Sequence, residues 1–196
     1  MNIDDKNLNS NENDKIIFNF KENCKFIKGK KPKEICNFNK KHTELYLTID
    51  VLKGQENIYG NTENTIHINK NDILIVSDGA SSGDIYYGKE GILGSTLSKI
   101  EISNEYADII LEYLKYYSKQ IKKNNTGSAI PHVDKGFILS LEIELPENSK
   151  YIQDIFQTLH KKIIKNNEEV ELLSKLRDTL LPKLLSGELD VSGIEV

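Results

Sequence analysis

The stretch ELLSKLRDTLLPKLLSGELDV, residues 171–191, closes a leucine-rich pattern that starts near Ser149. Its apolar residues return at steps of three and four, which is the spacing of one face of an α-helix. The pattern predicts a continuous helix over 149–186, on the order of 50 Å long at about 1.5 Å per residue. A compact domain of the size that precedes it cannot cover such a helix, so we expect a partner helix, as in a coiled coil.

The predicted contact row of this helix follows alternating three- and four-residue steps. It consists of Phe156, Leu159, Ile163, Asn166, Val170, Leu173, Leu180 and Leu184, with Arg177 at the intervening position. A second apolar row widens the face and contains Leu172, Leu176, Leu181 and Leu185. Asn166 is the kind of polar insertion that fixes helix register. We expect Pro182 to kink or restart the last turns and Gly187 to cap them, before a tail over 187–196. The alternative is a single core helix.

Upstream of the helix the pattern is that of a mixed α+β domain over 15–146, after an Asn- and Asp-rich segment, 1–14, that we expect to be disordered. Short runs rich in β-branched and aromatic residues predict strands at 44–52, 64–68, 72–77, 84–88 and 136–145. Between them, residues 105–123 have the apolar period of a helix, for which Ser103 or Asn104 is the expected N-cap. The fold class is therefore α+β, with a substantial β-sheet and a long C-terminal coiled-coil-type helix.

Charge is distributed unevenly along the 196 residues, although the net charge is only −4. Residues 15–41 carry nine lysines and two acids, whereas residues 168–196 carry seven acids and three bases. Such an asymmetry can mark a surface that binds a polyanion, and otherwise represents solvated surface. Two cysteines, no apolar run long enough for a membrane span and no secretory signal favour a cytoplasmic location and no membrane partner.

Catalytic patterns are weak. GASSG, residues 79–83, matches the G-x-S-x-G nucleophile elbow with Ser81 as nucleophile, but the glycine-studded segment after it lacks the required helix. A serine hydrolase is therefore disfavoured. Cys24, Cys36 and His42 lack the spacing of a zinc site, and no cofactor fingerprint occurs. We predict no catalytic residues, no metal and no cofactor, so the chain is not an enzyme.

Three loop regions are suited to nucleic acid instead. A Gly- and Pro-containing turn, 27–35, offers lysines for phosphate contacts, namely Lys28, Lys30, Lys31 and Lys33. The Gly- and Ser-rich segments 77–83 and 88–96 offer free amides and small hydroxyls, with Ser77, Ser81 and Ser82 as candidates. A third loop, 122–132, offers Asn124, Asn125, Thr126, Ser128 and His132. Together these residues are our predicted contacts to double-stranded DNA.

The chain resembles the specificity (S) subunits of type I restriction–modification systems. The tail matches the L-x-x-L-R-x-x-L-L-x-x-L-x-S-G pattern at the end of their conserved helical region. Two further segments agree with the family's target recognition domains, namely DILIVSDGASSGDIYYGKEGILGSTLSKIE (72–101) and GSAIPHVDKGFILSLEIELP (127–146). IKGKKPKEI (27–35) stands where such domains commonly carry a Gly-(Thr)-Pro turn, here altered to GKKP. The resemblance spans roughly residues 16–191.

The resemblance implies a function and a set of partners. A full S subunit has two target recognition domains and two long helices, whereas this chain has one of each and looks like a half-subunit. It implies a homodimer that reads the two halves of a bipartite target and docks methyltransferase (M) subunits, and possibly a restriction (R) subunit. Methyl transfer from S-adenosylmethionine would occur on those partners. The alternative is a coiled-coil scaffold or truncated decoy that does not bind DNA.

Overall fold

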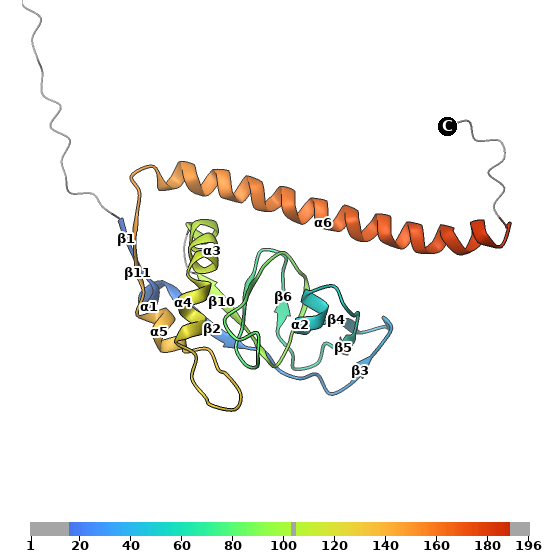
Figure 1. Ribbon diagram of the computed structural model, residues 1–196, viewed down its shortest axis with the longest axis horizontal. Helices are drawn as coiled ribbons and strands as arrows, with labels where there is room; N and C mark the ends of the chain where they lie inside the picture. Colours follow the sequence, from blue (N-terminus) through green and yellow to red (C-terminus); the bar gives the residue numbers. More distant parts are fainter. Residues whose placement is uncertain (1–15, 103–104, 189–196) are drawn as a thin grey trace, which may run out of the picture. The chain divides into compact units, whose positions relative to one another are not determined.

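The structure is a computed structural model, and it describes residues 16–102 and 105–188 (Figure 1). The predicted disordered segment 1–14, the two expected N-cap residues Ser103 and Asn104, and residues 189–196 lie outside the described residues. The chain divides after Asp154 into two units, and the long helix begins in the first unit and continues through the second. Sheets followed by a long helix confirm the predicted α+β class.

Within the described residues of the first unit, eleven strands form three sheets. Their bounds are β1 (Ile16–Asn19), β2 (Cys24–Lys28), β3 (Ile35–Cys36), β4 (Thr43–Leu47), β5 (Tyr59–Asn61), β6 (His67–Ile68), β7 (Ile73–Val76), β8 (Ile85–Tyr86), β9 (Gly91–Leu93), β10 (Leu97–Ile102) and β11 (Glu142–Leu145). The sheet orders are β2-β10-β7-β8, β3-β5-β4-β9-β6 and β1-β11. All pairs are antiparallel except β4 with β9.

Six helices occur in the described residues: α1 (Phe20–Asn23), α2 (Ile49–Leu52), α3 (Ala107–Tyr116), α4 (Ser118–Lys123), α5 (Lys135–Leu139) and α6 (Ser149–Leu185). The main core cluster joins the four-stranded sheet, the five-stranded sheet and α2. Its fully buried members are Leu47, Val51, Ile68, Leu74, Val76, Leu93 and Leu97. Leu47, Ile68, Leu74 and Val76 lie in predicted strands. Leu93 and Leu97 belong to β9 and β10, where no strand is predicted, so the sequence pattern located only part of this core.

Two predicted strands are wrong over part of their length, and in both a polar side chain starts a helix. Residues 44–52 form β4 only to Leu47, because Thr48 caps α2 by accepting a hydrogen bond from the backbone N–H of Val51. Residues 136–139 lie in α5, because the carboxylate of Asp134 accepts a hydrogen bond from the N–H of Phe137. A single polar residue at the start of a short segment thus outweighs its β-branched composition.

The predicted helix over 105–123 is two helices, α3 and α4, with a break at Tyr117. Tyr106, at the start of α3, makes no side-chain cap. The cap comes from Gln153 instead, whose Oε1 accepts hydrogen bonds from the N–H groups of Asp108 and Ile109 at 3.1 Å each. Gln153 Nε2 donates to Asp108 Oδ2 at 2.6 Å, which ties the second turn of α6 to α3.

The glycines of segment 88–96 pack against the protein's own backbone. A Cβ on Gly91 would overlap the carbonyl oxygen of Leu45, and one on Gly94 would overlap that of Leu47. Both glycines therefore let β9 and the turn after it approach β4 closely. The expectation that this segment offers free amides to a polyanion is corrected accordingly, because Gly91 and Gly94 are buried.

The helix α6 extends over 37 residues, close to the predicted range 149–186. It continues past Pro182 to Leu185, so the chain does not restart there as a separate helix. Gly187 has a φ of 73°, and its N–H donates to Leu184 O at 3.2 Å. That left-handed conformation is the one expected of a C′ glycine.

Candidate nucleic-acid interface

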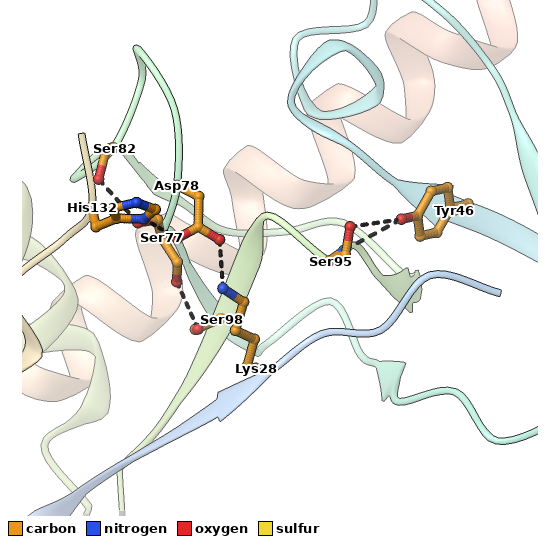
Figure 2. Close-up of polar contacts among 8 residues, drawn as sticks. All are labelled: Lys28, Tyr46, Ser77, Asp78, Ser82, Ser95, Ser98 and His132. Carbon is orange, nitrogen blue, oxygen red and sulfur yellow. Dashed lines mark hydrogen bonds and ion pairs between the residues drawn. The ribbon is translucent and has the colours of Figure 1, made fainter. Parts of the chain in front are cut away.

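Asp78, the second residue after β7, brings together three of the segments singled out in the sequence. Its Oδ2 accepts a hydrogen bond from Lys28 Nζ at 2.5 Å, and its Oδ1 accepts one from His132 Nδ1 at 2.7 Å (Figure 2). Lys28 ends β2, whereas His132 lies in the loop between α4 and α5. One carboxylate therefore bridges a residue 50 positions upstream and another 54 positions downstream.

The electrostatics of this bridge favour its ionised form. Partial burial alone would raise the pKa of the Asp78 carboxyl, but hydrogen bonds and charge interactions with Lys28 and His132 outweigh it. The pKa therefore lies below its ordinary value of 3.8. Lys135, at the start of α5, adds a further positive charge: burial, together with the neighbouring Lys28, lowers its pKa, and its Nζ lies 5.4 Å from the ring centre of Phe26.

Backbone hydrogen bonds fix the same two loops against each other. Gly79 N–H donates to Pro131 O, and Val133 N–H donates to Ser77 O, both at 2.9 Å. Thr126 and His132 exchange two backbone hydrogen bonds of 2.8 Å, which close residues 126–132 into a narrow loop. The predicted recognition loops 77–83 and 124–132 thus form one joined element.

The stretch GASSG is a turn rather than a nucleophile elbow. Gly79 and Gly83 have φ values of 101° and 94°, which glycine adopts without strain. The chain after Ser81 turns directly into β8, and no described helix starts there. Among the described residues, no helix stands where an oxyanion hole would require one, in agreement with the expectation that a serine hydrolase is disfavoured.

Two of the predicted contact residues are buried. Ser77 Oγ is hydrogen bonded to Ser98 Oγ at 2.7 Å, and Ser82 Oγ donates to Ser77 O at 3.1 Å (Figure 2). Asn125 is half-buried, and its Nδ2 donates to Ser82 O at 3.0 Å. These three side chains stabilise the joined loops from within. Asn124, Thr126, Ser128 and His132 are exposed, and Ser81 is half-buried.

The predicted lysines have different surroundings. Lys28 bonds Asp78, and Lys33 bonds Glu63 Oε2 at 3.0 Å. Lys30 and Lys31 are exposed and have no ion-pair partner among the residues that the structure describes. Pro32 is buried beside Gly60, so the loop that carries these lysines is anchored at its centre.

Sequence reasoning missed Asp78 and Lys135 as members of this site. An acid repels phosphate and was therefore not a candidate, although its position between two loops rich in glycine and serine could have indicated a structural joint. Lys135 follows His132 by three residues within the quoted 127–146 segment, and that proximity was the available signal.

The described part of α6 exposes most of its predicted contact row. Its exposed large apolar residues include Leu159, Ile163, Val170, Leu173, Leu176, Leu180 and Leu184. Asn166 is exposed and Phe156 is half-buried. An exposed heptad row of this length favours association with another helix.

Among the described residues no group of three or more His, Cys, Asp or Glu side chains could hold a metal ion. The helices described here include none long and apolar enough to cross a membrane.

Comparison with known proteins agrees with the resemblance seen in the motifs. The protein named Type I restriction enzyme MjaVIII specificity subunit, from Methanocaldococcus jannaschii, is 34% identical over 168 residues, which are 83% of this chain and 40% of that protein. The crystal structure of the S subunit of a type I restriction–modification system from M. genitalium has a TM-score of 0.62 at 20% identity, and covers 92% of this chain and 48% of that one. The HsdS subunit from Thermoanaerobacter tengcongensis has a TM-score of 0.55 at 17% identity, covering 89% of this chain and 46% of that one.

The chain spans less than half the length of each of these proteins. A family model described as "Type I restriction modification DNA specificity domain" matches residues 12–174. Because that match includes most of the chain, the chain belongs to the family of type I restriction modification DNA specificity domains.

Proposed function

We propose that this chain recognises double-stranded DNA as the non-catalytic specificity component of a type I restriction–modification complex. The observation that carries the proposal is the Asp78 bridge, because it unites Lys28 with loops 77–83 and 124–132. Exposed hydroxyl, amide and imidazole groups on rigid loops suit base edges, while nearby lysines suit phosphates. Family membership supports this reading.

The proposed contact residues are the exposed members of the predicted set, to which we add Lys135. Lys30 and Lys31 are proposed phosphate contacts, since neither has an intramolecular ion pair in the described chain. Lys33 retains that role more weakly, because Glu63 neutralises it. Ser77 and Ser82 are buried and bonded internally, so we propose that they shape the loop in place of the DNA contact expected from the sequence.

We further propose that two copies pair through α6 and read the two halves of a bipartite, symmetric target. The exposed apolar row from Leu159 to Leu184 supports helix pairing. A closed pair with twofold symmetry would present two identical recognition domains, and hence require a palindromic site. Methyltransferase subunits, and in a full system a restriction subunit, are the proposed further partners, in the cytoplasm where the DNA lies.

The test is to co-express the chain with its neighbouring methyltransferase subunit and to map adenine methylation across the genome. We expect a new bipartite palindromic motif. An asymmetric motif would refute the homodimer, and no new methylation relative to the methyltransferase alone would refute DNA recognition. Lys30→Ala and Lys31→Ala should weaken duplex binding equally for all sequences and reduce its salt dependence.

A coiled-coil scaffold or decoy is the second candidate, because the exposed apolar row of α6 supports association whether or not the first unit binds DNA. Such a protein would dimerise and bind the methyltransferase subunit, yet have no salt-dependent affinity for a mixed-sequence duplex.

A further inference from the structure

The connection between β3 and β4, residues 37–42, presents a large aromatic side chain to solvent. Phe38 is 61% exposed, so most of its ring adds nothing to the hydrophobic stabilisation of the fold. It lies outside the Asp78 bridge and the two loops that the bridge joins. The question is what an exposed ring at this position contacts.

The loop that carries Phe38 has a fixed conformation. Cys36 Sγ donates to Phe38 O at 3.2 Å, and Thr43 Oγ1 donates to Lys40 O at 2.9 Å while it accepts from Lys40 N–H at 2.8 Å. His42 adopts a left-handed φ of 63°, and its carbonyl accepts from Thr62 N–H. Hydrogen bonds on both sides of Phe38 thus restrain the backbone of the loop that carries the exposed ring.

The chain segment that carries Phe38 is strongly basic in sequence, and one of its lysines lies beside the ring. Residues 25–41 contain seven lysines and one acid, Glu34, which gives a net charge of +6. The ammonium group of Lys40 lies 4.6 Å from the centre of the Phe38 ring. Lys30, Lys31 and Lys41 are exposed as well. A purely apolar protein partner would have to desolvate these charges without compensation.

We propose that Phe38, Lys40 and Lys41 form a second DNA-contact surface, distinct from the Asp78 bridge and its loops. Two rows of phosphates flank each groove of a duplex, and the groove floor offers sugars and base edges of lower charge. Lys40 and Lys41 contact the phosphates, while the Phe38 ring contacts sugars or bases between them, as apolar wedges do in DNA-bending proteins. This surface rests on the proposed function and extends the DNA contact to the five-stranded sheet.

The two kinds of contact have different salt dependences, and this difference provides the test. The full-length chain is titrated into a fluorescently labelled duplex of mixed sequence at several salt concentrations. Lys40→Gln and Lys41→Gln should each lower the slope of log affinity against log salt by about 0.9, because each removes one phosphate contact. Phe38→Ala should weaken binding roughly tenfold with the slope unchanged, since it removes an uncharged contact.

Tyr116→Ala is the matched control, because Tyr116 is an even more exposed aromatic residue of the same unit, beside the Glu112–Lys115 ion pair. It should bind as the wild type does. Melting temperatures are measured for all variants to identify any that do not fold. If Phe38→Ala is unstable, the salt slopes of Lys40→Gln and Lys41→Gln test the surface without it.

If the wild type binds DNA and all three variants bind with the same affinity and salt slope as the wild type, this surface is refuted and the proposed function stands. Absence of salt-dependent binding by the wild type would refute the proposed function itself. A Phe38→Ala variant that changes the slope as a lysine variant does would refute the assignment of the ring to an uncharged contact.

Discussion

Replacement of Gln153 by alanine tests whether the start of α6 is a structural part of the recognition domain. Gln153 is buried, and its carboxamide satisfies two backbone N–H groups at the start of α3 together with the Asp108 carboxylate. In Gln153→Ala the two N–H groups lose this acceptor at a buried position. Each unsatisfied buried donor costs about 1–3 kcal/mol, and loss of a helix cap costs about 0.5–2 kcal/mol.

The cost of the unsatisfied N–H groups and the cost of the lost cap overlap, because the cap consists of the hydrogen bonds to these same N–H groups. Water that enters the space left by the side chain recovers part of the loss. We expect a loss of about 2–4 kcal/mol in the free energy of unfolding. For a chain of this length, that corresponds to a fall in melting temperature of roughly 4–16 °C. Urea unfolding followed by far-ultraviolet circular dichroism measures the loss directly, since the chain has no tryptophan.

Gln157→Ala is the control, because Gln157 lies one turn later on α6 and is exposed. Among the residues that the structure describes, its carboxamide accepts a hydrogen bond only from Lys161, at 3.0 Å, and its removal should cost less than about 0.5 kcal/mol. Gln153→Glu adds a further check, since it keeps the acceptor but sets a second carboxylate beside Asp108, so it should destabilise most above about pH 5. Equal stability of Gln153→Ala and Gln157→Ala would refute the role of Gln153 as the cap of α3.

Three further predictions concern the bridge, the sheet contact and the long helix. Since the pKa of Asp78 lies below 3.8, its ionised form contributes stability that is present above about pH 4 and is lost as the pH falls through the lowered pKa. Urea midpoints of the wild type and Asp78→Asn should therefore differ at pH 7 and converge once the pH falls below the lowered pKa of Asp78; a difference that stays constant with pH would contradict the bridge. Gly94→Ala should destabilise by about 1–3 kcal/mol in urea unfolding, because its Cβ would overlap Leu47 O; unchanged stability would contradict the close approach of this turn to β4. Leu173→Asp should convert a dimer to monomers in light scattering, whereas Lys175→Asp, on the opposite face of α6, should not; a dimer that survives Leu173→Asp would exclude that row as the contact.

The elements that the sequence predicted well are those with a long repeat or a strong local rule. The period of α6 repeats through ten turns, so its bounds were correct to within about one residue, and Gly187 obeys a rule for helix ends that depends only on its neighbours. The buried strand β7 was equally clear, because four consecutive apolar residues precede a Gly- and Ser-rich turn.

Elements whose structure depends on distant partners were predicted poorly. The cap of α3 comes from a residue 45 positions away, and no local rule could have selected Gln153 for it. In the same way, Gly91 and Gly94 look like loop residues, because their close approach to β4 depends on a parallel strand pair that is invisible along the chain. The sequence predicted that the three loops share residues suited to DNA, but not that they lie together. Asp78, which joins them, is an acid that would repel phosphate, so it was not among the predicted residues.

In the loop between Thr126 and His132, the residues that fix the conformation differ from the residues whose side chains are exposed. Backbone atoms of its two end residues close it, and Gly127 provides its left-handed turn, whereas the side chains of residues 128–130 point to solvent and support nothing inside the protein. Substitutions at these three positions therefore alter what the loop presents without altering how it folds. Such a loop can acquire a new preference by few mutations, and it is a natural position at which to randomise this protein in a library selected for altered target sequences.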